Sequence, residues 1–257
     1  MPPLEDLSVS DDASRLLGRF SAGIRGVLPL VALWAHGSLA FGDFVPGRSD
    51  LDLVALTGVP VTSAQREGLQ RLHETLISDE PLAAGLHCAY VVSGEQADPN
   101  RTHLTWAHGE LFSRRVSQVT RRELGDGGVC LFGPAPETLI AAVTDTELAD
   151  YVRADLRDYW YPRTSRADLW LRDIWVDLGI LTLARANVTL REGRLITKRE
   201  ALDVAAAMGA PAEVVSDIRD RRYRTAWPLS AERRARRGEL TRTYIRAGID
   251  RTLGGLR

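Results

Sequence analysis

The stretch HGSLAFGDFVPGRSDLDLVAL, from His36 to Leu56, decides how the first part of this chain is interpreted. Asp50 and Asp52 flank a leucine at the start of a segment that is otherwise apolar. Side chains alternate between the two faces of a β-strand, so both carboxylates would project to the same side. Like charges placed so close together repel each other unless a cation joins them. The alternative is a strand that begins at the surface with both aspartates solvated, but the rest of the stretch favours a cation site.

The composition is that of an ordinary globular protein. The chain has 257 residues, of which 44% are hydrophobic and 26% charged, and its formal net charge is −1. With so little net charge, no overall field attracts it to nucleic acid or to a membrane surface, and we expect neither as a partner. Cys88 and Cys130 do not form a C-x-x-C pair, which argues against a disulfide scaffold and a structural zinc site.

The distribution of apolar residues favours a cytoplasmic protein. Residues 1–17 carry early acids and no long apolar stretch, so we expect no signal peptide. No segment approaches the roughly 20 consecutive apolar residues that a membrane-spanning helix needs. Basic runs at 219–224 and 232–237 are typical of exposed helix surfaces rather than of nucleic-acid binding. We expect a monomer.

Helices and strands alternate in the first half of the chain. Hydrophobic spacing predicts helices over 11–26 and 63–77. Strands are predicted at the short apolar runs 27–35, 51–56, 87–92 and 128–132. This alternation predicts a small α/β or α+β sheet domain.

The character of the sequence changes after GPAPE, at 133–137. A Thr-x-x-Glu capping box at Thr144 predicts the start of a helix, and a second box begins at Thr197. Helix-forming sequence then continues almost to the end. We therefore predict a domain of residues 1–143 and a helical bundle of residues 144–257.

The Gly37-Ser38 turn gives the opening stretch its chemistry. A turn of this kind offers backbone N–H groups and a hydroxyl to a phosphate. Paired carboxylates such as Asp50 and Asp52 are hard oxygen ligands suited to Mg²⁺, which also binds phosphate oxygens of a substrate. Together the two features predict a site that holds a metal-bound nucleoside triphosphate.

Two motifs carry a resemblance to a known family. Gly37-Ser38 with Ser49-Asp50-Leu51-Asp52 resembles the signature of the polymerase-beta-type nucleotidyltransferase superfamily. The segment 181–206 is similar to the C-terminal helical domain of the aminoglycoside adenylyltransferases that act on streptomycin and spectinomycin. The resemblance implies an α+β fold, in which a polymerase-beta-like nucleotidyltransferase sheet domain precedes a C-terminal helical bundle.

The resemblance also implies adenylyl transfer, in which a hydroxyl of a drug attacks the α-phosphorus of ATP and pyrophosphate leaves. Asp50 and Asp52 would hold the magnesium ions, and the substrate would lie between the two domains. The resemblance assigns ATP contacts to Gly37, Ser38, Ser49, Arg185 and Lys198.

Helical spacing in the second half supports one of these assignments. Leu171, Ile174, Leu178, Leu181 and Arg185 share one helix face, so Arg185 extends an apolar stripe. An unpaired cation would be costly there, and the alternatives are a bound phosphate or a salt-bridged arginine. Asp173 and Asp177 lie on the adjacent face, where they could grip a cationic aminoglycoside or be solvated. We count both, with Glu110, as candidate substrate-binding residues.

His87 marks a departure from the family, which has a glutamate as general base on this strand. Histidine could accept the hydroxyl proton but is a poor Mg²⁺ ligand, and a buried structural histidine is the alternative. A second departure is the absence of acids at Leu171, Trp175 and Leu178, which makes streptomycin a poor candidate.

The hypothesis is therefore an ATP- and Mg²⁺-dependent adenylyltransferase for a small hydroxylated acceptor, an aminocyclitol antibiotic such as spectinomycin, which would confer antibiotic resistance. One alternative is the same chemistry on a different acceptor. The other is a nucleotide-binding protein that has lost catalysis together with the third acid.

Overall fold

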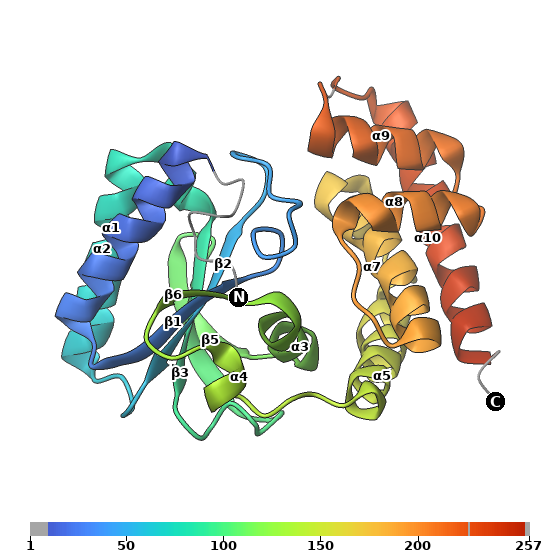
Figure 1. Cartoon of the computed structure of the whole chain (residues 1–257). Helices are drawn as coiled ribbons and strands as arrows, with labels where there is room; N and C mark the ends of the chain where they lie inside the picture. Colours follow the sequence, from blue (N-terminus) through green and yellow to red (C-terminus); the bar gives the residue numbers. More distant parts are fainter. Residues whose placement is uncertain (1–9, 226, 255–257) are drawn as a thin grey trace. The chain divides into compact units, whose positions relative to one another are not determined.

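The computed structural model describes residues 10–225 and 227–254 and divides into two compact units. The first unit ends at Val143 and the second begins at Thr144. In the described part of the chain, six strands form one mixed sheet and the second unit is helical (Figure 1). The α+β fold class with a C-terminal helical region is confirmed.

The sheet of the first unit has the strand order β5-β4-β3-β2-β1-β6. Its strands are β1 (Leu30–His36), β2 (Leu51–Thr57), β3 (Leu86–Val92), β4 (Thr102–Ala107), β5 (Glu110–Arg115) and β6 (Val129–Phe132). Strands β2 and β3 are parallel, and the other neighbouring pairs are antiparallel. The parallel pair is joined by helix α2 (Ser63–Asp79) and a short 3-10 turn (Pro81–Gly85), as a crossover connection requires.

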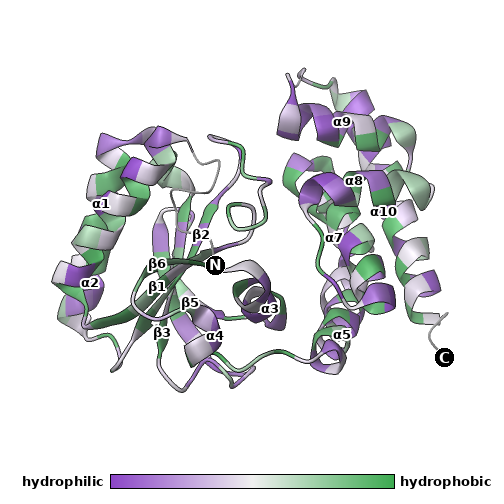
Figure 2. Cartoon of the chain, viewed as in Figure 1, coloured by the Kyte–Doolittle hydropathy of each residue, from purple (hydrophilic) through white to green (hydrophobic). Residues whose placement is uncertain are grey.

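Helices cover both faces of this sheet. Helix α1 (Asp11–Val27) and α2 lie side by side on one face, where Phe20 of α1 packs into a core with Leu53 and Tyr90. Helix α3 (Gln118–Gly127) covers the other face, where Leu124 packs with Trp34 and Val54. A single-turn helix, α4 (Pro136–Leu139), follows β6. Figure 2 shows the central strands as mostly apolar, as expected for a sheet covered on both sides.

The structure corrects the predicted elements of this unit in two places. The first strand begins at Leu30 rather than at residue 27, because α1 continues to Val27 and an extended Leu28 follows it. Three elements that occupy most of residues 102–127 were not predicted from the sequence, namely β4, β5 and α3. The other predicted helices and strands are confirmed to within two residues.

A buried polar contact lies in the core between α2 and the sheet. His73 is 1% exposed, and its Nε2 atom lies 2.5 Å from the hydroxyl of Tyr90. Its ring stacks on Trp106, with ring centroids 4.4 Å apart. Burial lowers the pKa of His73 to about 3, with a smaller contribution from the nearby His87, and burial also raises the pKa of Tyr90. His73 is therefore neutral throughout the physiological range.

The second unit consists of helices. They are α5 (Asp145–Ala154), a π-helical turn (Asp155–Trp160), α6 (Tyr161–Arg163), a 3-10 turn (Leu169–Leu171), α7 (Asp173–Glu192), α8 (Lys198–Ala207), α9 (Ala212–Tyr223) and α10 (Ala231–Gly254). Both predicted capping boxes are confirmed, since Thr144 caps α5 and Thr197 caps α8. Helix α9 is mostly hydrophilic, as Figure 2 shows. Among the residues that the structure describes, no helix combines the length and the apolar character needed to cross a bilayer.

Candidate functional site

Three polar side chains lie side by side on neighbouring strands of the first unit. His36 of β1 pairs with Asp52 of β2, and Asp52 in turn pairs with His87 of β3. Residues directly opposite each other on paired strands project from the same face of a sheet. Asp50 lies one residue before β2, on the same side as Asp52. The predicted aspartate pair and His87 are thus brought together at one end of the parallel strand pair.

The imidazole of His87 lies between the two carboxylates. Its Nε2 atom is 3.9 Å from Oδ1 of Asp50, and its Nδ1 atom is 3.6 Å from Oδ1 of Asp52. The aspartate side chains are 51% and 36% exposed, whereas that of His87 is 13% exposed. Both carboxylates are therefore accessible to a ligand from solvent. The less exposed imidazole of His87 lies next to the position that such a ligand would occupy.

The Gly37-Ser38 turn approaches these carboxylates closely. Gly37 has a φ of +64°, and a Cβ atom at this position would lie 3.0 Å from Oδ2 of Asp52. A side chain here would crowd the carboxylate and strain the backbone, so glycine is required. The hydroxyl of Ser38 is 3.5 Å from the carbonyl oxygen of Asp50, which it approaches as a donor. The turn and the aspartate segment are therefore packed together. The side chains of Ser38 and Asp50 are still accessible to solvent.

Ser49 has a structural role within this loop. It is 5% exposed, and its hydroxyl accepts a hydrogen bond of 3.0 Å from the backbone N–H of Val45. The N–H group of Ser49 itself donates to the carbonyl oxygen of Val45. This pair of hydrogen bonds closes the loop that leads into β2. A contact of Ser49 with ATP stays a prediction.

A buried histidine–glutamate pair that was not predicted from the sequence lies beside Asp52. Nδ1 of His36 is 2.9 Å from Oε2 of Glu123, which comes from α3, and both side chains are about 10% exposed (11% and 10%). Burial alone would lower the pKa of His36, but the hydrogen bond to Glu123 and the negative charge of Asp52 raise it. The position of His36 directly before the Gly-Ser turn is the one feature of the sequence that could have indicated a role for it in the site.

The donor set fits magnesium that is bound together with a triphosphate. Among residues 10–225 and 227–254, no group of three or more His, Cys, Asp or Glu side chains is arranged to hold a metal ion. Asp50 and Asp52 supply two carboxylates that are open to solvent. Mg²⁺ is typically held by one or two carboxylates, substrate phosphates and water rather than by an all-protein cage. The residues present are of that kind.

The remaining predicted ATP ligands belong to the second unit. Arg185 lies on α7 and Lys198 is the first residue of α8, and these two helices pack against each other. Both side chains are half-buried. The apolar stripe that leads to Arg185 is buried at Leu181. The predicted stripe is wrong at Leu171, which lies in the 3-10 turn before α7, since the extended Arg172 separates the two elements. Leu171, Ile174 and Leu178 are exposed. Whether Arg185 and Lys198 contact ATP stays a prediction.

The two acids on α7 are neutralised by arginines of the same unit. Asp177 is 2.6 Å from Arg221 of α9, and Asp173 is 2.5 Å from Arg237 of α10. Asp217 joins the two pairs, at 2.5 Å from Arg221 and 2.8 Å from Arg237. This network supplies a structural reason for both aspartates. The Asp173 side chain is still 58% exposed and that of Asp177 12%, and contact of either with a substrate stays a prediction.

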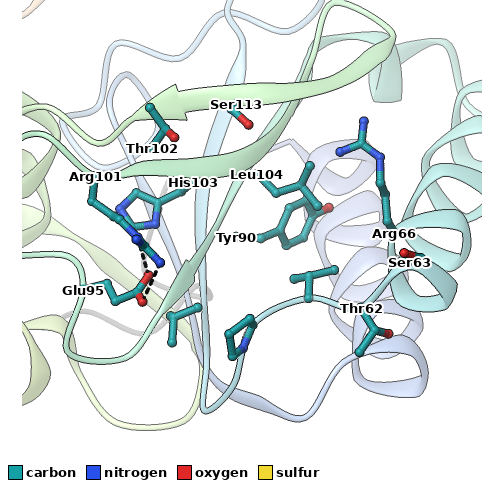
Figure 3. Close-up of a pocket in the computed structure, with 13 residues that line it drawn as sticks. Thr62, Ser63, Arg66, Tyr90, Glu95, Arg101, Thr102, His103, Leu104 and Ser113 are labelled. Atoms are coloured by element: carbon teal, nitrogen blue, oxygen red, sulfur yellow. Dashed lines mark hydrogen bonds and ion pairs between the residues drawn. The ribbon is translucent and has the colours of Figure 1, made fainter.

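Glu110 lies at the same end of the sheet as His87. It is exposed and begins β5, opposite the last residue of β4, Ala107. A pocket of about 290 Å³ lies instead at the far end of β3, where Tyr90 and Val92 contribute to its wall (Figure 3). This pocket includes none of the predicted site residues. Three charged side chains line it, and two of them, Glu95 and Arg101, form an ion pair of 2.9 Å, while the third is Arg66.

Comparison with known proteins supports the fold but gives no match at the level of sequence. No family model matches the chain, and no curated protein matches it. The structure is similar to that of spectinomycin adenyltransferase AAD(9) from Enterococcus faecialis, solved with ATP and spectinomycin, with a TM-score of 0.71. The similarity covers 92% of this chain and 99% of that one at 16% sequence identity. The chain thus has a distant structural relationship to an adenylyltransferase.

Proposed function

We propose that the chain is an ATP- and Mg²⁺-dependent adenylyltransferase that moves AMP to a hydroxyl of a small acceptor. The observation that carries the proposal is the convergence of Asp50, Asp52 and His87 beside the Gly37-Ser38 turn. The similarity in fold to an enzyme that was solved with ATP and spectinomycin agrees with it.

Each residue of the site has a role in this reaction. Asp50 and Asp52 would hold the magnesium, and the Gly37-Ser38 turn would donate to phosphate oxygens. Magnesium bound there would supply positive charge that stabilises the attacking and leaving oxygens. The hydroxyl oxygen of the acceptor forms a bond to the α-phosphorus as the bond to the leaving pyrophosphate breaks. His87 would take the hydroxyl proton. Its imidazole lies within 4 Å of both carboxylates, so it is close to the place where magnesium and the reacting groups would bind, and it is largely shielded from water.

Spectinomycin is the acceptor that we propose to test first. Polycationic aminoglycosides are expected to need acids, but Asp173 and Asp177 are paired with arginines. The positions at Leu171 and Leu178 present exposed apolar side chains. An acceptor with few positive charges suits this surface better than streptomycin does.

The first experiment measures pyrophosphate release with ATP, Mg²⁺ and a panel of acceptors, including spectinomycin, streptomycin and no acceptor. The proposal expects acceptor-dependent release that Asp50→Asn abolishes. A thermal-shift measurement on the same samples separates the alternatives, because a ligand that binds only the folded state raises the melting temperature. Stabilisation by ATP and Mg²⁺ without release would favour a binding protein that has lost catalysis. Release with another acceptor would favour a different substrate.

A further inference from the structure

His108 contacts the proposed base from outside the aspartate pair. The rings of His87 and His108 are 4.8 Å apart between centroids, and their planes make an angle of 69°. Edge-to-face is one of the two arrangements that aromatic rings prefer. His108 is exposed, whereas the His87 side chain is 13% exposed. An exposed ring on the β4–β5 turn therefore contacts the largely shielded ring of the proposed base.

The backbone at His108 adopts a left-handed conformation that is uncommon for residues other than glycine, although Asn, Asp and His are enriched in it. His108 and Gly109 form the two-residue turn between β4 and β5, with Ala107 paired to Glu110. Their φ angles are +55° and +82°. Turns with two positive φ values favour Asn, Asp or Gly at the first position. Among the described residues, His108 is the one non-glycine with a positive φ. Histidine tolerates this region better than most non-glycine residues do, and residues with positive φ also gather at functional sites.

The carboxylates do not fix the orientation of the His87 ring. Their oxygen atoms are 3.6 and 3.9 Å from its nitrogen atoms, which is longer than a hydrogen bond. A general base must hold its nitrogen within hydrogen-bond reach of the proton that it takes. Within the part of the chain that the structure describes, His108 supplies the neighbouring ring that packs against this imidazole.

We propose that His108 is a positioning residue that holds the imidazole of His87 in the orientation needed to accept the hydroxyl proton of the acceptor. This inference rests on the proposed function. It gives the histidine of this left-handed turn a purpose, because its ring reaches His87 from the turn. The contact is aromatic packing, so a phenyl ring should replace the imidazole.

Two substitutions separate this role from a role in folding. His108→Asn removes the ring but suits the left-handed turn, so the melting temperature should not fall. It should lower kcat about tenfold and leave KM for ATP unchanged, because misplacement of a reacting group costs rate rather than nucleotide binding. His108→Phe keeps the ring and should retain most of the parent's kcat. A kcat for His108→Phe as low as that of His108→Asn would overturn the proposal.

A double-mutant cycle and a spectroscopic measurement complete the test. In the His87→Ala background, His108→Asn should cause no further loss of kcat, and an equal loss in both backgrounds would contradict positioning through His87. In proteins with ¹³C-labelled histidine, His108→Asn should shift the ring resonances of His87, since the neighbouring ring current is lost. An unchanged His87 resonance would overturn the contact itself. This measurement needs no activity, so it stands even if the parent transfers no AMP and the proposed function fails.

Discussion

Lowering the pH should destabilise the first unit through His73, and the size of the effect follows from its burial. The folded pKa of His73 is about 3, against an ordinary value of 6.5 in the unfolded chain. Because the unfolded state binds more protons, stability is fully present above pH 6.5 and is lost as the pH falls toward 3. At pH 5 the unfolded histidine is almost fully protonated, while the folded one is almost fully neutral. The linkage relation gives a loss of about 2 kcal/mol between pH 7 and pH 5.

The assay compares urea denaturation of the parent and of His73→Gln at these two pH values. Glutamine keeps a hydrogen-bonding group near the hydroxyl of Tyr90 but does not titrate. Other titrating groups affect both proteins alike, so the difference between them isolates His73. The parent should lose about 2 kcal/mol more than the variant on acidification. An equal loss in both proteins, or a His73 ring resonance that titrates above pH 5, would refute the reasoning.

Three further outcomes are expected. Asp52→Asn should keep the fold but remove Mg²⁺-dependent ATP binding, measured by calorimetry, because an amide lacks the charge that offsets the cation; undiminished binding would contradict the metal site. Arg185→Ala and Lys198→Ala should each raise KM for ATP about tenfold with an unchanged circular dichroism spectrum, since a charge-assisted contact is worth about 1.5–3 kcal/mol. A collapse of stability with unchanged KM would make those residues structural. Glu123→Gln should lower the pKa of His36, measured by NMR. It should also remove the stabilisation that the raised pKa gives, which is fully present below pH 6.5 and is lost as the pH rises through the folded pKa. An unchanged pKa of His36 would show that the pair is not coupled.

Local signals in the sequence predicted much of the fold. The capping boxes at Thr144 and Thr197 are satisfied within four residues of chain, so their positions could be read directly. The β4–β5 hairpin was missed, although its His108-Gly109 turn is of the X-Gly kind that joins two-residue hairpins. Helix α3 was missed because it has few apolar residues and buries charged ones, including Arg121 and Glu123.

The site was predictable where its residues are close in sequence and unpredictable where tertiary contacts decide. The aspartate pair follows from the alternation of one strand, and the pairing of β2 with β3 adds His87. The partner of His36 is Glu123, which lies 87 residues away in the sequence on a helix that the sequence pattern did not predict. Asp173 likewise acquires its arginine from 64 residues away. Spacing along one helix carries no information about such partners.

The most direct test of the central claim is transfer of AMP from ATP labelled at the α-phosphorus. The purified chain is incubated with Mg²⁺ and spectinomycin, and the acceptor is separated and analysed for label and for the added mass of AMP. The account predicts labelled, adenylylated acceptor with the parent and none with Asp50→Asn. Labelled acceptor formed equally well by Asp50→Asn would contradict the assignment of the site. Failure of the parent to label any acceptor in the panel, despite binding ATP and Mg²⁺, would contradict the assignment of the reaction.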